Sequence, residues 1–437
     1  MARTYYIETW GCQMNELDTQ RLSGHLKLRG YKRVDREAQA DLILLNTCSV
    51  RDKAEQKVFS HLGRLRELKL TQQENGRDLK IGVCGCVAQQ EGEAILERAP
   101  WVDFVMGPGN VGHLDDVLEN GKRIALEFHE DRNYDFANID RTSATKAWVT
   151  IIEGCNKNCT FCIVPTTRGR EISRPFEQVL DEVRAAVATG RVEIELLGQT
   201  VNAYRCPQSG RDFGALLTAV AEIEGVVRLR FMTSHPAEVS DSMIAAMRDH
   251  ENISRYLHLP VQSGSSRVLR RMKRLYTREK YLETIARIRE AIPDAHFSTD
   301  IIVGFPGETD EDFEETISLL EEVRYGSLFA FKYSPRPGTP SLKIGEPLDD
   351  AIATARLNRL FDVHERHKRE RLASYEGRVV PVLVEGTSAK NPEMLSGRTD
   401  DYWVVNFRGD LSTPLGSILA VRIDSAQHHT LRGEAVA

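Results

Sequence analysis

Three cysteines at short, regular spacing are the strongest chemical signal in this sequence of 437 residues. Cys155, Cys159 and Cys162 follow the pattern Cys-x3-Cys-x2-Cys within GCNKNCTFC. An ordinary [4Fe–4S] cluster takes four cysteines, so three thiolates on one loop leave one iron without a protein ligand. An open iron can bind a cofactor such as S-adenosylmethionine. The pattern therefore predicts a cluster with an open position and radical chemistry.

A second group of cysteines lies where parallel strands are predicted to end. Cys12, Cys48 and Cys86 each follow a short apolar run. The carboxyl ends of strands in an open parallel sheet share one edge, so we expect these thiols to converge. Cys84 lies two residues before Cys86 on the same face of its strand, but inside the apolar run, which favours Cys86. Cys206 stands alone and is expected to be structural.

Zinc is the alternative metal, because it also binds thiolates. Structural zinc sites usually take four ligands in paired CxxC spacing, and the Cys155–Cys162 segment lacks that pairing. The spacing favours iron and sulfur. A non-catalytic RNA-binding protein with zinc in both thiolate sites stays open as a second hypothesis.

The elements that must position these cysteines alternate between strand and helix patterns, which predicts an α/β fold with parallel sheets. Residues 3–119 form a parallel-sheet domain, residues 120–140 a polar linker, and residues 141–372 a core of six βα units. Six units are fewer than the eight of a closed barrel and predict an open, partial (β/α)6 barrel, with the triplet on the rim after its first strand. Residues 374–437 hold short β-type runs and predict a small all-β barrel. Strands are expected near residues 5–8, 42–45, 81–83, 104–106, 148–153, 192–198, 227–233, 256–261, 297–303 and 328–333.

Composition indicates a globular protein of the reducing cytosol. The chain is 41% hydrophobic and 28% charged, and its eight cysteines are too sparse for a disulfide scaffold. The N-terminal residues lack the apolar core of a signal peptide, and no apolar run has membrane-spanning length. We therefore expect a cytoplasmic protein without a membrane segment.

Two basic runs stand out against the net charge of −6. One extends from Arg267 to Lys280 and the other from Arg366 to Arg371. A solvated helix face is the ordinary interpretation of one such run, but two runs in an acidic protein predict an RNA footprint. The candidates for contacting RNA phosphates are Arg267, Arg270, Arg271, Lys273 and Arg274.

The triplet, with Phe161 before its last cysteine, resembles the signature of the radical S-adenosylmethionine superfamily. The full chain is similar to the methylthiotransferase family through WGCQMNELD, NTCSVRDKA, GCVAQQEGE, EGCNKNCTFCIVPTTRGRE, HLPVQSGSSRVLRRMKR and STDIIVGFPGETDEDF. Its C-terminal part is similar to a TRAM domain, a small RNA-binding module. NTCSVR and LVEGTSAKNPEMLSGRTD resemble the branch that acts on dimethylallyladenosine in tRNA.

The resemblance implies an enzyme that methylthiolates N6-dimethylallyladenosine at position 37 of tRNA. It implies two [4Fe–4S] clusters, an auxiliary one on Cys12, Cys48 and Cys86 and a radical one on the triplet, together with two molecules of S-adenosylmethionine. It further implies a monomer and an electron donor of the reduced flavodoxin or ferredoxin type, and leaves the sulfur donor open. Threonylcarbamoyladenosine in tRNA or an aspartate of a ribosomal protein are the alternative substrates.

A few residues near the predicted rim are candidates for contacting the cofactor or the substrate. The resemblance implies that Phe161 shields the cluster near the adenine of the cofactor. Gln199 stands where many radical enzymes carry a Glu that grips the cofactor's amino group, and its carbonyl oxygen can still accept a hydrogen bond. Gly304 permits close approach of a ligand, or a tight turn. His258 and Gln262 either line the pocket or pack internally.

Overall fold

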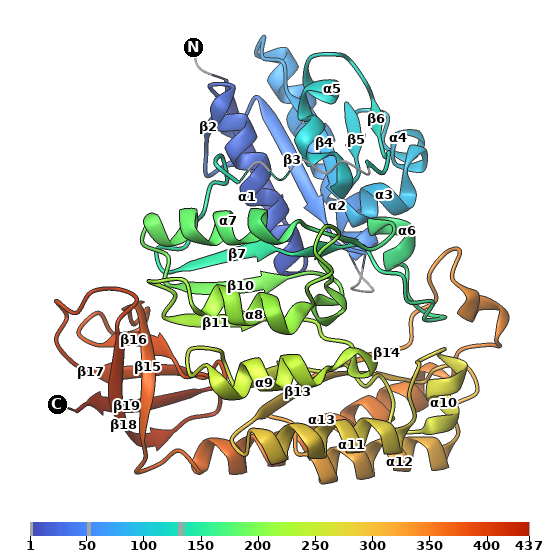
Figure 1. Ribbon diagram of the computed structural model, residues 1–437. Helices are drawn as coiled ribbons and strands as arrows, with labels where there is room; N and C mark the ends of the chain where they lie inside the picture. Colours follow the sequence, from blue (N-terminus) through green and yellow to red (C-terminus); the bar gives the residue numbers. More distant parts are fainter. Residues whose placement is uncertain (1–2, 50–53, 130–133, 135, 437) are drawn as a thin grey trace. The chain divides into compact units, whose positions relative to one another are not determined.

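The computed structural model describes residues 3–49, 54–129, 134 and 136–436, without the side chains of residues 54 and 55. The chain divides into two compact units (Figure 1). The first comprises Met1–Thr142 together with Glu153–Lys157 and Cys162–Ile172. The second comprises Ser143–Ile152, Asn158–Phe161 and Ser173–Ala437.

The first unit is built on a six-stranded parallel sheet in the order β2-β1-β3-β4-β5-β6. Every residue of the central strand β3 is buried, which is expected of a parallel strand covered on both faces. The strands are β1 (Thr4–Thr9), β2 (Lys32–Arg33), β3 (Leu42–Thr47), β4 (Lys80–Gly85), β5 (Phe104–Met106) and β6 (Ile124–Ala125). The helices are α1 (Gln13–Leu28), α2 (Ala54–Glu74), α3 (Cys86–Glu91), α4 (Glu93–Arg98), α5 (Leu114–Leu118) and α6 (Val164–Arg168), with 3-10 turns at Glu37–Gln39 and Pro108–His113.

The register of this sheet brings three strand ends to one edge. Thr9 of β1 is opposite Asn46 of β3, and Thr47 of β3 is opposite Gly85 of β4. The loops that leave these strands therefore begin side by side. The three predicted cysteines lie in or directly after these loops.

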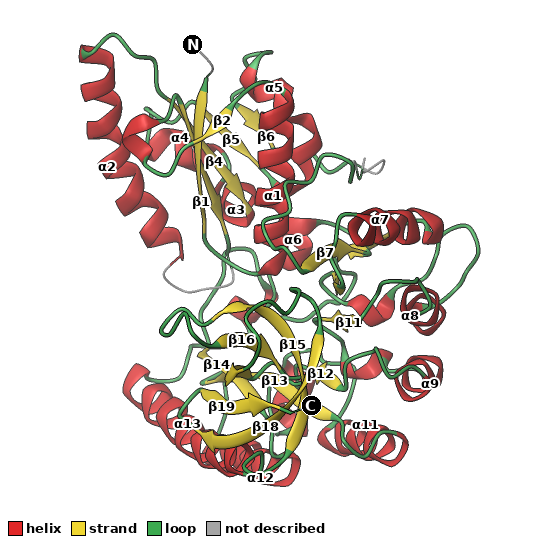
Figure 2. Ribbon diagram, turned by 90° about the vertical axis from the view of Figure 1, so that its left-hand side faces the viewer, coloured by secondary structure: helices red, strands yellow, loops and turns green. Residues whose placement is uncertain are grey.

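The second unit contains the predicted partial barrel. Its parallel strands form two three-stranded sheets, β11-β10-β7 and β12-β13-β14, and a backbone bridge between Leu229 and Ile253 connects them. The six strands therefore follow one another in sequence order, as the six βα units predicted, and Figure 2 shows the helices as an outer arc around them. The strands are β7 (Lys146–Thr150), β10 (Glu193–Leu197), β11 (Arg228–Phe231), β12 (Tyr256–His258), β13 (His296–Val303) and β14 (Ser327–Lys332), with short strands β8 (Ile152–Glu153) and β9 (Ile172–Ser173). The helices are α7 (Phe176–Ala188), α8 (Phe213–Ala221), α9 (Asp241–Asp249), α10 (Ser266–Arg271), α11 (Arg278–Ala291), α12 (Asp310–Val323) and α13 (Asp350–Ala373), with 3-10 turns at Val201–Ala203, Pro236–Glu238 and Pro340–Lys343.

A closed five-stranded barrel ends the chain, as predicted, in the order β15-β16-β17-β19-β18. Its core contains Val382, Val405, Phe407 and Ile423, all fully buried. The strands are β15 (Val379–Thr387), β16 (Leu395–Arg398), β17 (Val404–Arg408), β18 (Ile418–Ala426) and β19 (Thr430–Ala435).

Charged side chains line the interior of the partial barrel on β10 and β11. Ile194 and Leu229 face the helices and join the main apolar core, so their neighbours Glu193 and Arg230 face the opposite way. Arg230 Nε donates to Glu193 Oε2 at 3.2 Å, and both side chains are 1% exposed. The C-terminal barrel completes this network, because the hydroxyl of Tyr402 donates to Glu195 and the Arg230 guanidinium lies 3.9 Å from the Tyr402 ring centroid.

One local feature differs from the sequence predictions. The predicted linker contains β6, which adds an edge strand to the first sheet through Val105 and Met106.

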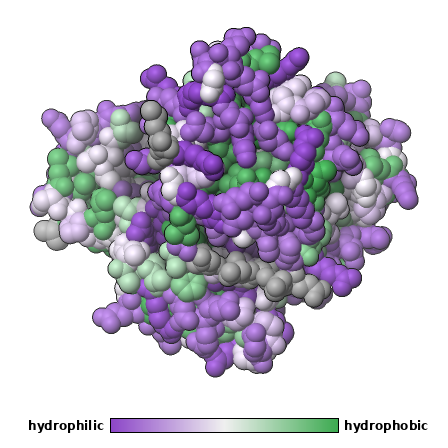
Figure 3. Space-filling view, turned by 90° about the horizontal axis from the view of Figure 1, so that it is seen from above, coloured by the Kyte–Doolittle hydropathy of each residue, from purple (hydrophilic) through white to green (hydrophobic). Residues whose placement is uncertain are grey.

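The face in Figure 3 is mostly hydrophilic, with hydrophobic residues in small groups. None of the described helices combines the length and apolar character needed to cross a membrane.

We expect Glu193→Gln to lower the free energy of unfolding by about 3 kcal/mol at pH 7, because it leaves the buried Arg230 without its carboxylate. Burial by itself would raise the pKa of Glu193, but Arg230, Lys146 and Arg228 outweigh it and lower the pKa to about 2. A carboxyl group with a depressed pKa adds stability above its unfolded pKa and loses that stability as the pH falls towards its folded pKa.

Urea denaturation of both proteins between pH 7 and pH 3 should therefore show the difference shrinking below about pH 4.3, the ordinary pKa of a glutamate. Glu251→Gln, at an exposed glutamate of the same unit, is the matched control. A difference that stays constant through this pH range would contradict the role given to Glu193.

Candidate metal centre

The first unit brings Cys12, Cys48 and Cys86 to one edge of its sheet. Cys12 precedes α1, Cys48 follows β3, and Cys86 is the first residue of α3. A Cβ atom on Gly11 would lie only 2.6 Å from the Cβ atom of Cys48, so this close approach of the two loops requires glycine.

The thiols of this trio influence one another. A hydrogen bond with Cys48 is the main cause that lowers the pKa of Cys12 to about 6, and the positive charge of Arg168 lowers it further. Burial raises the pKa of Cys86, although Arg168 acts against it. The edge of the sheet therefore favours one thiolate in the absence of any metal, which is the protonation state that binds metals.

Arg168 is the cation of this site, and the sequence did not indicate it. It is 4% exposed, and its Nη2 donates to Asp18 at 2.7 Å and to Asn15 at 3.1 Å. Its positive charge acts on both Cys12 and Cys86. Asp18 pairs with Arg168 and so offsets part of the charge that faces the trio.

Cys84 is separate from this site. It is 2% exposed and lies in the apolar cluster with Leu44, Phe104 and Met106. Burial, followed by the nearby Asp18, raises its pKa to about 12. A thiol in these surroundings stays protonated and behaves as a small apolar side chain.

The donor set of the trio fits an iron–sulfur cluster, the first of the two hypotheses. A structural zinc usually takes four ligands, and Cys84, the other cysteine of this sheet, lies apart in the apolar core. Three thiolates would hold three irons of a [4Fe–4S] cluster.

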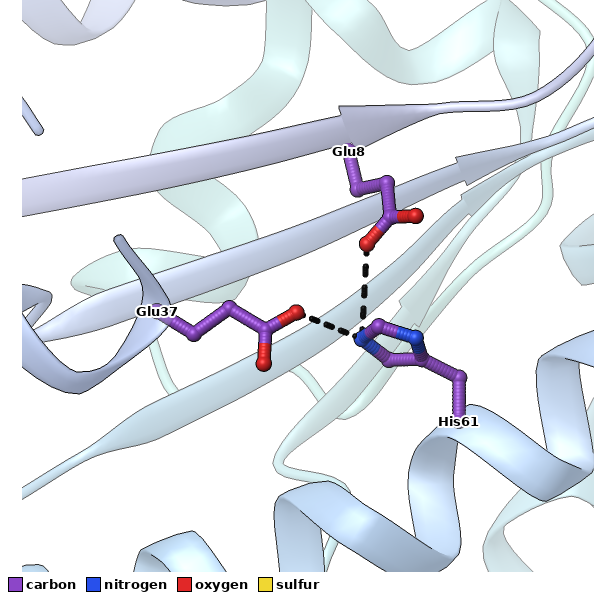
Figure 4. A group of neighbouring side chains, drawn as sticks. All are labelled: Glu8, Glu37 and His61. Carbon is purple, nitrogen blue, oxygen red and sulfur yellow. Dashed lines mark ion pairs between the residues drawn. The ribbon is translucent and has the colours of Figure 1, made fainter. Parts of the chain in front are cut away.

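One group of described side chains brings its possible metal-ligating atoms within 4.8 Å of one another. It consists of Glu8 on β1, Glu37 and His61 (Figure 4). His61 Nε2 lies 2.8 Å from Glu37 Oε1 and 3.4 Å from Glu8 Oε2. Arg64 Nη2 lies 2.6 Å from His61 Nδ1, and a guanidinium only donates, so Nδ1 accepts and the ring proton lies on Nε2. A protonated nitrogen cannot bind a metal, so we interpret this group as a polar anchor of α2.

The triplet lies on the loop after β7 and β8. In the first unit, the Cys155 N–H donates to Gly169 O at 3.2 Å, and the Lys157 N–H donates to Cys155 Sγ at 3.4 Å. A Cβ atom on Gly154 would lie 2.0 Å from Arg170 O, so this turn needs glycine. Cys155 and Cys162 are both partly exposed.

Cys159 belongs to the second unit, where it is 8% exposed. Its sulfur accepts a hydrogen bond from Arg274 Nη1 at 3.3 Å. The expectation that Arg274 binds RNA phosphate therefore needs correction. Its side chain is partly buried, and its guanidinium is already bound by neighbouring groups of the fold.

The candidate cofactor contacts lie near the carboxyl ends of barrel strands. Phe161 packs against the apolar cluster of Val268, Met272 and Phe305. Gln199 follows Gly198, where a Cβ atom would lie 2.4 Å from Ile152 Cγ2. Gly304 forms a tight turn with φ +72°, and its N–H donates to Glu308.

His258 and Gln262 are both buried. His258 Nδ1 lies 2.8 Å from the Ser298 hydroxyl, and Nε2 lies 3.4 Å from Asp300. Gln262 has φ +74°, and its backbone exchanges hydrogen bonds with Asp300 and Ile302. Of the two alternatives, lining the pocket or packing internally, we therefore favour internal packing for both residues.

The two basic runs are largely paired within the second unit. Arg267 binds Asp312, Arg271 donates to Pro306 O, and Arg278 binds Glu322. The second run is paired in the same way, and the RNA footprint expected on it stays a prediction. The pairs there are Arg366 and His367 with Glu321, Lys368 and Arg369 with Glu365, and Arg371 with Asp401. Arg270 and Lys273 remain exposed.

Comparison with known families agrees with this organisation. Residues 4–107 match the Uncharacterized protein family UPF0004, residues 149–320 the Radical SAM superfamily, and residues 373–436 the TRAM domain.

Curated relatives extend the match to nearly the whole chain. The tRNA-2-methylthio-N(6)-dimethylallyladenosine synthase of Clostridium tetani is 45% identical over 99% of this chain and 96% of its own length. The enzyme of the same name from Alkalilimnicola ehrlichii is 46% identical over 99% and 98%. The chain belongs to this family of synthases. The names of these relatives specify dimethylallyladenosine and neither of the alternative substrates.

Solved structures share the fold of these synthases. The radical S-adenosylmethionine methyltransferase TsrM from Kitasatospora setae has a TM-score of 0.56 and 14% identity, covering 78% of this chain and 77% of its own. The cobalamin-dependent radical enzyme OxsB has a TM-score of 0.54 and 16% identity, covering 84% and 56%. At this identity the likeness concerns the fold alone.

We expect Cys86→Ala and Cys84→Ala to differ in the iron they retain after anaerobic reconstitution. Cys86→Ala removes a thiol from the trio and should cost about four of about eight irons per chain. Cys84→Ala should keep the full iron content, because that thiol lies in the apolar core. Iron and sulfide analysis measures both variants. Loss of four irons in Cys84→Ala alone would reverse the choice between the two cysteines.

Proposed function

We propose that this protein methylthiolates N6-dimethylallyladenosine at position 37 of tRNA, giving 2-methylthio-N6-dimethylallyladenosine. It is a transferase of the radical S-adenosylmethionine type. One observation carries the proposal: relatives named for this product are 45% and 46% identical over 99% of the chain. The thiolate sites described above supply the donors that such an enzyme needs.

The six cysteines of the two groups would hold two [4Fe–4S] clusters. Cys12, Cys48 and Cys86 would bind the auxiliary cluster, and Cys155, Cys159 and Cys162 the radical cluster. When bound, the radical cluster supplies S-adenosylmethionine with one electron and so the radical reactivity that an unactivated aromatic C–H bond requires. Three ligands in each group leave one iron open, for the cofactor in one case and for sulfur in the other.

The chain's own residues orient the groups that react. Phe161, on its apolar cluster, would cover the cofactor, with Gln199 and Gly304 contacting it at the strand ends. Arg168 would keep the auxiliary thiolates in place, because Asp18 and Asn15 fix its guanidinium. Acid–base chemistry alone cannot begin this reaction, since the target carbon offers no acidic proton.

Binding of tRNA would involve the C-terminal barrel and the exposed tip of the first basic run. We propose the domain limits 3–119, 120–140, 141–372 and 374–437, with the last as the TRAM domain. Arg270 and Lys273 would contact phosphates there. An unstacked anticodon-loop base is accessible to such an enzyme, because extruding it costs at most a few kcal/mol.

The electron for the radical cluster would come from a donor of the reduced flavodoxin or ferredoxin type. We propose that the protein acts as a monomer in the cytoplasm.

Nucleoside analysis by mass spectrometry tests the reaction. In a strain that lacks this gene, the wild-type chain should restore 2-methylthio-N6-dimethylallyladenosine. The variant with Cys155, Cys159 and Cys162 changed to Ala should restore none and leave N6-dimethylallyladenosine to accumulate. Cys206→Ala, outside both groups, is the matched control and should behave as wild type. Product formed by the triple variant would disprove radical catalysis by the triplet.

Salt-dependent tRNA binding tests the proposed phosphate contacts. Changing Arg270 and Lys273 together to Ala should weaken binding by about tenfold at low salt. It should also reduce the slope of log K against log salt by about one to two, because each lost phosphate contact lowers it by about 0.7–0.9. Arg184→Ala, at an exposed arginine of α7, should leave the slope unchanged. An unchanged slope in the double variant would exclude this surface.

A further inference from the structure

Arg274 donates three hydrogen bonds from its guanidinium, and one of them reaches a cysteine of the triplet. Nη1 lies 3.3 Å from Cys159 Sγ, Nη2 donates to Pro260 O at 3.0 Å, and Nε donates to the Tyr276 hydroxyl at 2.9 Å. Tyr276 itself donates to the Pro260 carbonyl at 3.1 Å. The fork of the arginine is therefore fixed from two sides and directed at the sulfur.

The segment before Arg274 also holds the ligand loop. The Thr160 N–H donates to Met272 O at 3.0 Å, and the Thr160 hydroxyl donates to Arg271 O at 3.0 Å. Lys273 has φ +54°, a left-handed backbone conformation that residues other than glycine rarely adopt. This turn reverses the chain directly after α10 and places Arg274 beside Cys159.

The charge of Arg274 is not balanced by an acid. Among the described residues, the hydrogen-bond partners of its guanidinium are a thiol, a carbonyl and a phenol. Arg168, the corresponding cation of the trio, is paired with Asp18 instead. Cys159 therefore faces a cation without an acidic hydrogen-bond partner, whereas Asp18 offsets part of the charge that faces the trio.

We propose that Arg274 is a positioning residue that holds the Cys159 sulfur and favours one-electron reduction of the cluster bound by Cys155, Cys159 and Cys162. The proposal rests on the proposed function in requiring that cluster. Reduction adds one electron to the cluster and makes it more negative, and no bond or proton changes place. A fixed cation and a hydrogen bond to a ligating sulfur stabilise the more negative state and raise the reduction potential.

The experiment is a redox titration with dithionite as the one-electron reductant, followed by electron paramagnetic resonance without tRNA. The full-length chain carries Cys12, Cys48 and Cys86 changed to Ser, so that only the radical cluster is observed. Arg274→Gln should make reduction at least tenfold less favourable, a potential lower by about 59 mV for one electron. Arg274→Lys keeps the charge and should shift less. Arg270→Gln, on the exposed side of α10, should not shift.

Equal potentials in wild type and an iron-loaded Arg274→Gln would overturn the proposal, as would an equal shift in Arg270→Gln. If Arg274→Gln cannot be loaded with iron, Arg274→Lys against Arg270→Lys decides, and the proposal requires a shift in the first only. Because the potential is measured without substrate, a shift in this titration together with no methylthio product from the wild-type chain in the nucleoside analysis would reject the proposed function and leave this inference standing.

Discussion

Thiolates gathered at the ends of parallel strands repel one another, and the folded chain is arranged to offset that repulsion. Burial alone keeps a thiol protonated, as the raised pKa of Cys84 shows. At the edge of the sheet, the hydrogen bond with Cys48 and the positive charge of Arg168 outweigh burial and lower the pKa of Cys12 to about 6. One sheet therefore carries an inert thiol inside its core and, at its edge, a thiol that favours the thiolate form.

Charge pairing also stabilises the interior of the partial barrel. Glu193 and Arg230 are almost completely buried, which is tolerated because each is the partner of the other. The remaining donors of Arg230 reach backbone carbonyls of the C-terminal barrel, including Thr399 O at 3.0 Å. The C-terminal barrel is thus part of the polar core of the second unit, which fixes a candidate RNA-binding module to strands β10 and β11 of the partial barrel.

The architecture and the convergence of Cys12, Cys48 and Cys86 at one sheet edge could be predicted because they depend on local signals. Alternating patterns locate the strands of both units, and the rule for strand ends places Cys12, Cys48 and Cys86 together. The two-residue strands β2 and β6 could not be predicted, because their pairing comes from the neighbouring strand rather than from their own composition. Arg168 could not be predicted either, since its partner Asp18 lies 150 residues away in the sequence.

Arg274 shows why a basic run in a sequence does not define a surface. Its neighbours Arg270 and Lys273 are exposed, yet a left-handed turn at Lys273 directs Arg274 inward to Cys159. The direction of one side chain depends there on a backbone angle that residue type does not reveal. The consequence is electrostatic, because the charge that would have bound a phosphate at the surface lies beside the sulfur of Cys159 instead. Asp18 offsets the charge of Arg168, whereas no acid is among the described hydrogen-bond partners of Arg274, so the two groups of three cysteines have different electrostatic surroundings.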